Sequence, residues 1–501
     1  MGCCSSKVED DPTTEIDISN KGLKELPEDI LKLSKLVKLQ GGSNGISLLP
    51  DQIANLKELK HLEFPSNALK QFPVALPPSL TVILFANNRL FYSPIQPSIG
   101  LLVNLQHLDL SANQLESLPM EIGQLTSLKT LDISKNLMVE LPEGIYQLGN
   151  TLEKLLIFEN KLTKIDTNID ALASLTYLDV TNNHISHISK AISGCSNLQV
   201  LKIGANIFHD VPEVICNLSK LEVLEITDNP HIISIPVVFS QLVKLEQVSL
   251  NQLKIDRFPM ALENWMSIKD LSIRNNHGIL EIPDIIGSLP QLRSLDCQDC
   301  TISAIPYTIG DLSNLTRLDL RKNRITSYDI PETIGQLESL TKLNLSHNQL
   351  TTIPDDLFQL GSLTELDLSH NTISDLPEEL GKLKNLVKIL INYNKISSIP
   401  SSVGELINLS ILECHHNLLD TLPDSIGKCA NLTRLDFSDN HIHDLPNDLG
   451  DLKILIFINF KGNNLIPELN TALQGGKDSI LKVLQVRKEK SKYTARLADK
   501  K

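Results

Sequence analysis

The chain is poor in several features that would point to other classes of protein. Aromatic residues make up 4% of its 501 residues, so its core cannot depend on aromatic packing. Eight cysteines are too few for a disulfide scaffold of this length, which favours a reducing compartment. There is no run of 18 apolar residues, and the N-terminus lacks the positive and apolar regions of a signal peptide. A formal net charge of −14 argues against nucleic acid as a partner.

A 23-residue pattern repeats along nearly the whole chain, and a clear copy runs from Leu340 to Ser362. The next copy starts at Leu363 with the same spacing. Leu343 and Leu345 alternate with polar residues. This period of two predicts a short strand that buries the two leucines and exposes the side chains between them. The pattern is that of a leucine-rich repeat.

An asparagine follows each strand, where the chain must turn over the top of the stack. Backbone N–H and C=O groups are buried there without a strand partner, and one amide side chain can bond both kinds of group. A repeated asparagine therefore predicts a structural ladder. Its predicted members are Asn113, Asn136, Asn160, Asn183, Asn323, Asn348, Asn371, Asn394, Asn417 and Asn440. A step such as Ile353-Pro354 then favours an extended turn, after which the chain returns along the outside.

The repeats predict the fold class and the division of the chain. One copy cannot bury its apolar edge alone, so copies must stack. About twenty strand starts predict an α/β leucine-rich repeat solenoid (horseshoe) with a parallel concave sheet and a C-terminal capping helix. We expect residues 1–12 to be an N-terminal anchor and linker, 13–467 the solenoid, and 468–501 a cap helix with a basic tail. Asp478–Lys490 has the cap and apolar face of that helix.

The pattern is irregular in one part of the chain. Its departures are Leu253 and Cys300 in ladder positions, single insertions after Asn229 and Asn276, and two residues inserted between Asn323 and Pro331. Leucine cannot form the ladder hydrogen bonds, so we expect a local irregularity there. Either neutral drift or a partner-contacting loop would explain these departures.

The first seven residues, MGCCSSK, predict lipidation. Gly2 follows the initiator Met and Ser6 stands where an N-myristoylation site needs Ser or Thr. One myristoyl chain binds a membrane only with K of about 10⁴ M⁻¹, so stable anchoring needs a second signal. A basic patch is missing, which leaves palmitoylation of Cys3, Cys4 or both. We expect the protein at the cytoplasmic face of the plasma membrane, with a cytosolic pool; the alternative is an unmodified tail.

No set of catalytic residues is apparent. Cys297 and Cys300 match C-x-x-C, but they fall on a buried strand position and a ladder position, so a structural role is preferred over redox chemistry or zinc. With no nucleophile, base and oxyanion donors in view, we expect a non-enzyme that needs no cofactor and no metal.

Three histidines and a tyrosine occupy the residue before the ladder asparagine in nearby copies: His347, His370, Tyr393 and His416. Their rings should lie about 5 Å apart, close enough to stack or to hold a fortuitous metal. Ser-His-Asn is also a frequent filler of this motif, so the column carries no site prediction.

The exposed strand positions form the expected partner-binding surface, because a rigid concave sheet presents them without an ordering cost. Apolar candidates on consecutive copies are Leu156, Phe158, Tyr177, Val200 and Val223, flanked by Asp109, Asp132, Asp179 and Glu225. A basic stripe further along consists of Arg274, Arg317, Arg321, Lys342 and Lys388, with Arg434 beyond them. The alternative is a solvated sheet with ion pairs inside the repeats.

The copies at Leu108–Ser134 and Leu343–Ser369 resemble the Ras-group intracellular leucine-rich repeat family, including the Ras-suppressor and Shoc-type scaffolds. This resemblance implies a non-catalytic signalling scaffold. It would bind a Ras-family small GTPase and a downstream kinase or phosphatase component, and an acylated N-terminus would hold it on the inner leaflet. The alternative function is a structural adaptor that organises cortical actin cytoskeleton or adhesion proteins without sensing the nucleotide state.

Overall fold

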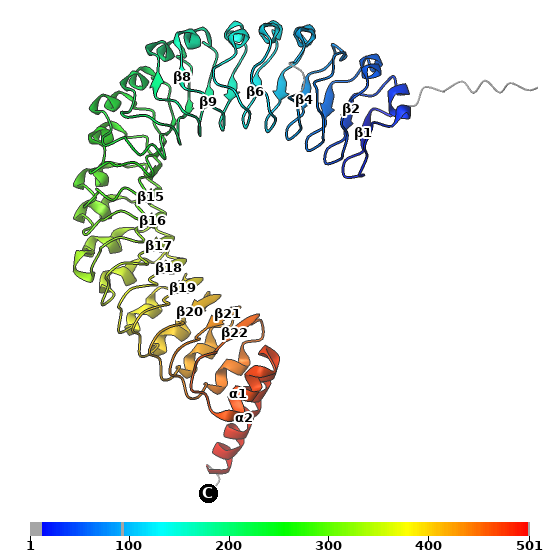
Figure 1. The fold of residues 1–501 in the computed structure, drawn as a ribbon. Helices are drawn as coiled ribbons and strands as arrows, with labels where there is room; N and C mark the ends of the chain where they lie inside the picture. Colours follow the sequence, from blue (N-terminus) through cyan, green and yellow to red (C-terminus); the bar gives the residue numbers. More distant parts are fainter. Residues whose placement is uncertain (1–12, 92–94, 499–501) are drawn as a thin grey trace, which may run out of the picture. The chain divides into compact units, whose positions relative to one another are not determined.

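The computed structural model describes residues 13–91 and 95–498. The chain forms two compact units, the first ending at Leu245 and the second beginning at Glu246. In each unit one short strand per repeat pairs in parallel with the strand of the next repeat (Figure 1). The predicted fold class, a leucine-rich repeat solenoid with a parallel sheet of about twenty strands and a C-terminal helix, is confirmed.

Ten strands in the described part of the first unit pair in sequence order. They are β1 (Glu15–Asp17), β2 (Lys38–Gln40), β3 (His61–Glu63), β4 (Val82–Leu84), β5 (His107–Asp109), β6 (Thr130–Asp132), β7 (Lys154–Leu156), β9 (Tyr177–Asp179), β11 (Val200–Lys202) and β12 (Val223–Glu225). A separate two-stranded parallel sheet joins β8 (Lys164–Ile165) and β10 (His187–Ile188).

The second unit also contributes ten strands to the described chain, again paired in order. They are β13 (Gln247–Ser249), β14 (Asp270–Ser272), β15 (Ser294–Asp296), β16 (Arg317–Asp319), β17 (Lys342–Asn344), β18 (Glu365–Asp367), β19 (Lys388–Leu390), β20 (Ile411–Glu413), β21 (Arg434–Asp436) and β22 (Phe457–Asn459).

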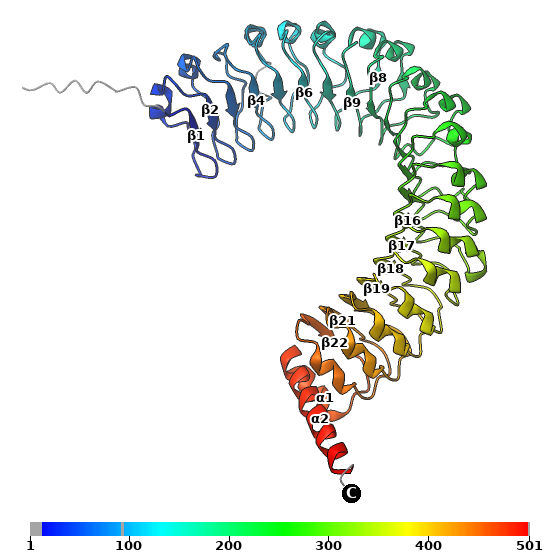
Figure 2. The same ribbon diagram turned by 180° about the vertical axis from the view of Figure 1, so that it is seen from behind.

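The return segments are single turns of 3-10 helix on the side opposite the strands (Figure 2). In the first unit they are η1 (Glu28–Lys32), η2 (Asp51–Asn55), η3 (Pro97–Leu101), η4 (Met120–Gln124), η5 (Glu143–Leu148), η6 (Thr167–Ala171), η7 (Lys190–Gly194), η8 (Glu213–Asn217) and η9 (Val237–Gln241). In the second they are η10 (Met260–Asn264), η11 (Asp284–Ser288), η12 (Tyr307–Asp311), η14 (Glu332–Gln336), η15 (Asp355–Gln359), η16 (Glu378–Lys382), η17 (Ser401–Glu405), η18 (Asp424–Lys428) and η19 (Asn447–Asp451). One more short 3-10 turn, η13 (Ser327–Asp329), precedes η14 in the same repeat.

The leucine pattern explains both layers. Leu343 is 2% exposed at the centre of β17, and Leu345 behind it is 1% exposed. On the return side the extended Pro354 precedes η15, which buries Leu357. Fully burying one such leucine stabilises the fold by roughly 1.5–3 kcal/mol, so the repeated pattern supplies a continuous core. Gly310 lets neighbouring return turns approach, because a Cβ there would lie 2.6 Å from the Thr333 carbonyl oxygen.

Each asparagine of the predicted ladder bridges two repeats. Asn371, for example, donates from Nδ2 to the carbonyl oxygens of Leu345 and Leu368 at 3.0 Å, and its Oδ1 accepts the Leu350 N–H at 2.9 Å. The other nine members also donate to a carbonyl of the preceding repeat. The same bond is made by Asn44, Asn67, Asn88, Asn206, Asn229, Asn276 and Asn463.

The residue before each ladder position adopts a left-handed backbone conformation. Nineteen non-glycine residues of the described chain, from Asn20 to Asp439, have φ between 48° and 59° there. Glycine tolerates this region best, and β-branched residues tolerate it worst. None of the nineteen is Val, Ile or Thr.

The irregular repeats keep the stack but change its bonding. Leu253 is 5% exposed in its ladder position, and within the described chain the Oδ1 of Asn276 finds no hydrogen-bond donor. Cys300 retains part of the ladder, since its Sγ donates to the Ile273 carbonyl at 3.3 Å. The two-residue insertion forms the extra turn η13, closed by a capping box between Thr326 and Asp329.

Two helices follow the last repeat, where one was expected. α1 (Pro467–Gln474) begins with a proline at its first position, and α2 (Lys477–Ala498) is longer than the predicted Asp478–Lys490. Ile480 and Leu484 are fully buried, so α2 closes the apolar edge of the last repeat. Arg487 adds a two-pronged pair with Asp444, both N–O distances being 2.8 Å.

Candidate protein-binding faces

Side chains on the exposed face of each sheet form rows, because neighbouring strands are parallel and in register. In the first unit, Lys154 on β7, Tyr177 on β9, Val200 on β11 and Val223 on β12 are successive register partners. The structure therefore brings three of the five predicted apolar candidates side by side in one row.

The other two apolar candidates lie beside this row. Leu156 is on β7, in register with Asp132 and Asp179 on the neighbouring strands. Phe158 follows two residues later. All five candidates are half-buried, so each keeps accessible apolar surface. Lysines also contact two of the rings. The Lys154 Nζ lies 4.4 Å from the ring centroid of Tyr177, and the Lys135 Nζ lies 5.9 Å from the ring centroid of Phe158.

The carboxylates around this apolar group have a structural role that sequence reasoning missed. Asp132 Oδ1 accepts the backbone N–H of Ser134 at 3.0 Å and its hydroxyl at 2.6 Å. Asp179 accepts the Thr181 N–H in the same way, at 3.0 Å. Burial raises the pKa of Asp132, and the two hydrogen bonds from Ser134 oppose that rise. Part of the acidic flank therefore fixes the turn after each strand.

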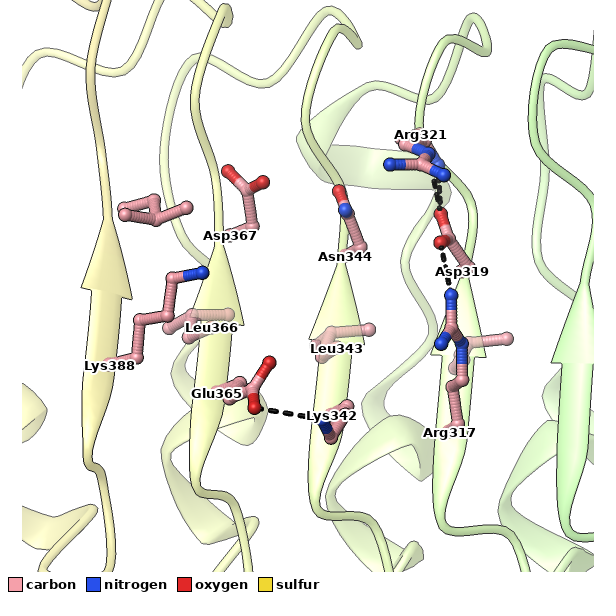
Figure 3. Close-up of a pocket in the computed structure, with 12 residues that line it drawn as sticks. Arg317, Asp319, Arg321, Lys342, Leu343, Asn344, Glu365, Leu366, Asp367 and Lys388 are labelled. Atoms are coloured by element: carbon pink, nitrogen blue, oxygen red, sulfur yellow. Dashed lines mark hydrogen bonds and ion pairs between the residues drawn. The ribbon is translucent and has the colours of Figure 1, made fainter. Parts of the chain in front are cut away.

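The arginines of the predicted basic stripe are paired with carboxylates between and within repeats. Arg274 Nε lies 2.9 Å from Asp296, and Arg317 lies 3.1 Å from Asp319 and 3.9 Å from Asp296. Arg321 reaches Asp319 at 3.5 Å (Figure 3). Both aspartates are 3% exposed. Three guanidinium groups thus share two buried carboxylates, while the arginine side chains remain 37–45% exposed.

The buried aspartates are electrostatically coupled. Burial, and then the carboxylate of Asp319, raise the pKa of Asp296, and the two nearby arginines oppose that rise. A buried carboxylate needs such partners to remain charged, because desolvation disfavours its ionised form. The aspartates in turn hold the guanidinium groups in place.

The lysines of the stripe are arranged differently. Lys342 pairs with Glu365 at 2.8 Å, across β17 and β18. Lys388 has no ion-pair partner within 4.0 Å among the residues that the structure describes. Carboxylates of the same sheet therefore pair with most of the basic stripe and leave Lys388 available to another partner.

Two shallow hollows adjoin this stripe. The first, of about 150 Å³, lies over β16 to β19 between Arg317 and Lys388 (Figure 3). The second, of about 390 Å³, lies past the strand ends and is lined by Arg321, His347 and His370 among others.

The column at the edge of the second hollow is a stack of rings. Ring centroids are 3.9 Å apart between His347 and His370, 4.3 Å between His370 and Tyr393, and 4.2 Å between Tyr393 and His416. Burial and then Lys322 lower the pKa of His347. Burial and then His347 lower the pKa of His370. The stack thus favours neutral imidazoles. Its neighbouring rings lie closer together than the roughly 5 Å expected from the strand spacing.

Sequence reasoning missed three further apolar residues on the exposed face of the second unit. Leu390, Ile411 and Phe457 are half-buried at outward strand positions, and the Arg434 guanidinium lies 4.0 Å above the Phe457 ring. The same alternation rule that selected Leu156 would have found them.

Five of the six cysteines in the described residues are buried. Cys195, Cys297, Cys300, Cys414 and Cys429 are buried thiols. Residues 13–91 and 95–498 contain no cluster of three or more His, Cys, Asp or Glu side chains that could hold a metal. Over the same residues, no helix has the length and apolar character required to cross a membrane.

Comparison with protein families agrees with the repeat pattern. A model of the leucine-rich repeat region matches residues 80–203 and 277–389, and a leucine-rich repeat model matches residues 428–445. The chain is a leucine-rich repeat protein. The matching models describe the repeats and indicate no catalytic family.

The curated relatives share only a segment with this leucine-rich repeat protein. Receptor-like protein 39 of Arabidopsis thaliana is 28% identical over 153 residues, which are 29% of this chain and 17% of the relative. The probable serine/threonine-protein kinase pats1 of Dictyostelium discoideum is 28% identical over 194 residues, 37% of this chain and 5% of the relative. The chain thus spans less than a fifth of either relative.

Solved structures share more of the fold. The plant peptide hormone receptor RGFR1 in complex with RGF2 gives a TM-score of 0.59 at 29% identity, covering 86% of this chain and 68% of the receptor. A leucine-rich repeat protein of Leptospira interrogans gives 0.52 at 28% identity, covering 92% and 93%. The leucine-rich repeat fold indicates a protein-interaction scaffold, and the receptor structure is a complex with RGF2.

Proposed function

We propose that this leucine-rich repeat protein is a non-catalytic, membrane-anchored signalling scaffold. In this proposal the concave face of the first unit binds a Ras-family small GTPase in its GTP state, and the second unit binds a downstream kinase or phosphatase component. Acylation at Gly2 and at Cys3 or Cys4 would hold the scaffold on the cytoplasmic face of the plasma membrane, beside lipidated GTPases. Those three residues lie outside the described part of the chain.

The observation that carries the proposal is the apolar group on β7 to β12. Tyr177, Val200 and Val223 form a continuous row, and Leu156 and Phe158 lie next to it, all with accessible surface. Aromatic and aliphatic side chains held on a rigid sheet are the usual material of binding hot spots. The similarity of the repeats to the Ras-group intracellular family supports a small GTPase as the partner.

Phe158→Asp tests the proposal. Pull-down with a panel of Ras-family GTPases loaded with a GTP analogue or with GDP should show binding that prefers the GTP form. Loss of a central hot-spot residue costs about 2 kcal/mol or more, so the variant should bind about thirty-fold more weakly. Leu101→Asp is the matched control, because Leu101 is an exposed apolar residue of η3 on the return side of the same unit.

Retention of full binding by Phe158→Asp would remove this face as the GTPase site. Equal binding of the GTP and GDP forms would favour the alternative, a structural adaptor of the cortical cytoskeleton without nucleotide sensing. A melting temperature close to that of the unaltered protein must accompany either result, since the half-buried ring contributes little to the core.

A further inference from the structure

The two hollows of the second unit form one groove. Arg321 and Asp367 line both of them, so the space over β16 to β19 continues into the space beside the ring stack. Small polar side chains, Ser346 and Ser369, line the second hollow between the strand ends and the rings. The groove therefore has a charged side along the strands and a flat aromatic side along the stack.

The charge of this groove is opposite to that of the chain. Its lining includes five basic side chains and three carboxylates, a formal net charge of +2, whereas the whole chain carries −14. The basic residues are Arg317, Arg321, Lys322, Lys342 and Lys388. A local excess of one sign on a chain of the other sign selects a partner segment by electrostatic complementarity.

Two of these cations are not used by the fold. The described residues provide no ion-pair partner within 4.0 Å for Lys322 or Lys388, whereas Lys342 is paired at 2.8 Å. Lys388 lines the hollow over the strands, and Lys322 lines the hollow beside the rings. The two unpaired lysines therefore lie on the two sides of the groove.

The length of the groove fits an extended peptide. It runs from Gln298, just past β15, to His415, just past β20, which is five strand spacings. At roughly 4.8 Å per spacing this is about 24 Å, the length of about seven residues in extended conformation. The stacked rings and the paired arginines fix the walls, so a ligand would meet a preorganised site.

We infer that this groove docks an extended segment of about seven residues, rich in Asp and Glu, from a protein partner. The inference rests on the proposed scaffold function and names the chemistry of its second partner. The carboxylates of the segment pair with Lys322 and Lys388 and lie near the partly exposed side chains of Arg317 and Arg321, and its backbone lies against the ring stack.

The test uses the full chain and a fluorescein-labelled peptide of seven glutamates, with seven glutamines as the neutral comparison. Fluorescence anisotropy at low salt should show tighter binding of the glutamate peptide, and added salt should weaken it. The double variant Lys322→Glu/Lys388→Glu should bind it roughly tenfold more weakly. Lys382→Glu/Lys428→Glu changes the net charge equally on exposed residues of the return helices η16 and η18 in the same unit and should bind as the unaltered chain.

Three results would overturn the inference: equal binding of the two peptides, no loss in the groove variant, or the same loss in the return-side variant, which would indicate a general charge effect. If the charge-reversed groove variant melts at lower temperature, Lys322→Gln/Lys388→Gln repeats the test without added repulsion and should still weaken binding. GTPase binding through Phe158 is measured on the other unit, so a failure of either proposal is recognised separately.

Discussion

Replacing Asn371 by alanine tests the energetic role of the asparagine ladder. Its side chain makes hydrogen bonds of 3.0 Å to the carbonyl oxygens of Leu345 and Leu368, and it accepts the Leu350 N–H at 2.9 Å. The residue is 8% exposed, so water cannot easily replace the amide.

A fourth, longer bond of 3.3 Å runs from Nδ2 to the Ser369 carbonyl oxygen, which keeps the His347 N–H at 2.8 Å after the substitution. The other three backbone groups are not affected equally. The Leu345 oxygen keeps a bond from Asn348 at 3.0 Å, and the Leu368 oxygen keeps one from Asn394 at 3.0 Å. The Leu350 N–H loses the acceptor that it has in the structure. One orphaned buried donor costs about 1–3 kcal/mol, and two carbonyls that each lose one of two donors add a smaller amount. We therefore expect Asn371→Ala to lower the free energy of unfolding by about 2–4 kcal/mol.

Urea unfolding followed by circular dichroism measures this loss, and hydrogen exchange of the Leu350 amide locates it. Asn385→Ala is the matched control, because Asn385 is exposed and donates one bond of 2.8 Å to the Gly361 carbonyl. The control should cost less than about 1 kcal/mol. Equal losses in the two variants, or unchanged exchange at Leu350, would refute the reasoning that burial makes the ladder bond matter.

Two further predictions concern pH and lipidation. The pKa values of His347 and His370 lie below the ordinary 6.5, so the unfolded chain binds more protons on acidification and stability should fall below about pH 6.5. The urea midpoint should drop between pH 7.5 and 5.5, and less so in His347→Gln/His370→Gln; an equal drop in that variant would contradict this cause. Gly2→Ala should move the protein from the membrane fraction to the cytosol, whereas Ser5→Ala, outside the required motif positions, should not; membrane retention of Gly2→Ala would rule out the acyl anchor.

The fold could be predicted because its rules are local. A period of 23 residues, with Leu343 and Leu345 alternating and Asn348 following, specifies strand, core and turn within one copy. The cap was harder to predict because part of its support comes from other repeats: Lys488, inside the predicted span, pairs with Asp448 and Asp451 of the last repeat. The helix itself continues past Lys490 to Ala498.

The binding faces were harder to predict because they depend on register between copies. Asp296 and Arg274 are 22 residues apart in the sequence, yet their side chains lie 2.9 Å apart on neighbouring repeats. The sequence pattern shows a basic stripe, but only the register between strands shows which of its side chains already pair with carboxylates of the fold. Lys388 stands out for that reason alone.

The left-handed turns limit which side chains can decorate one edge of the solenoid. Side chains branched at Cβ clash with the backbone in that conformation, so valine, isoleucine and threonine are excluded while aromatic, charged and small residues are all accepted. The positions are therefore selected by side-chain shape more than by polarity, so a row of rings such as His347, His370 and Tyr393 can stand along this edge.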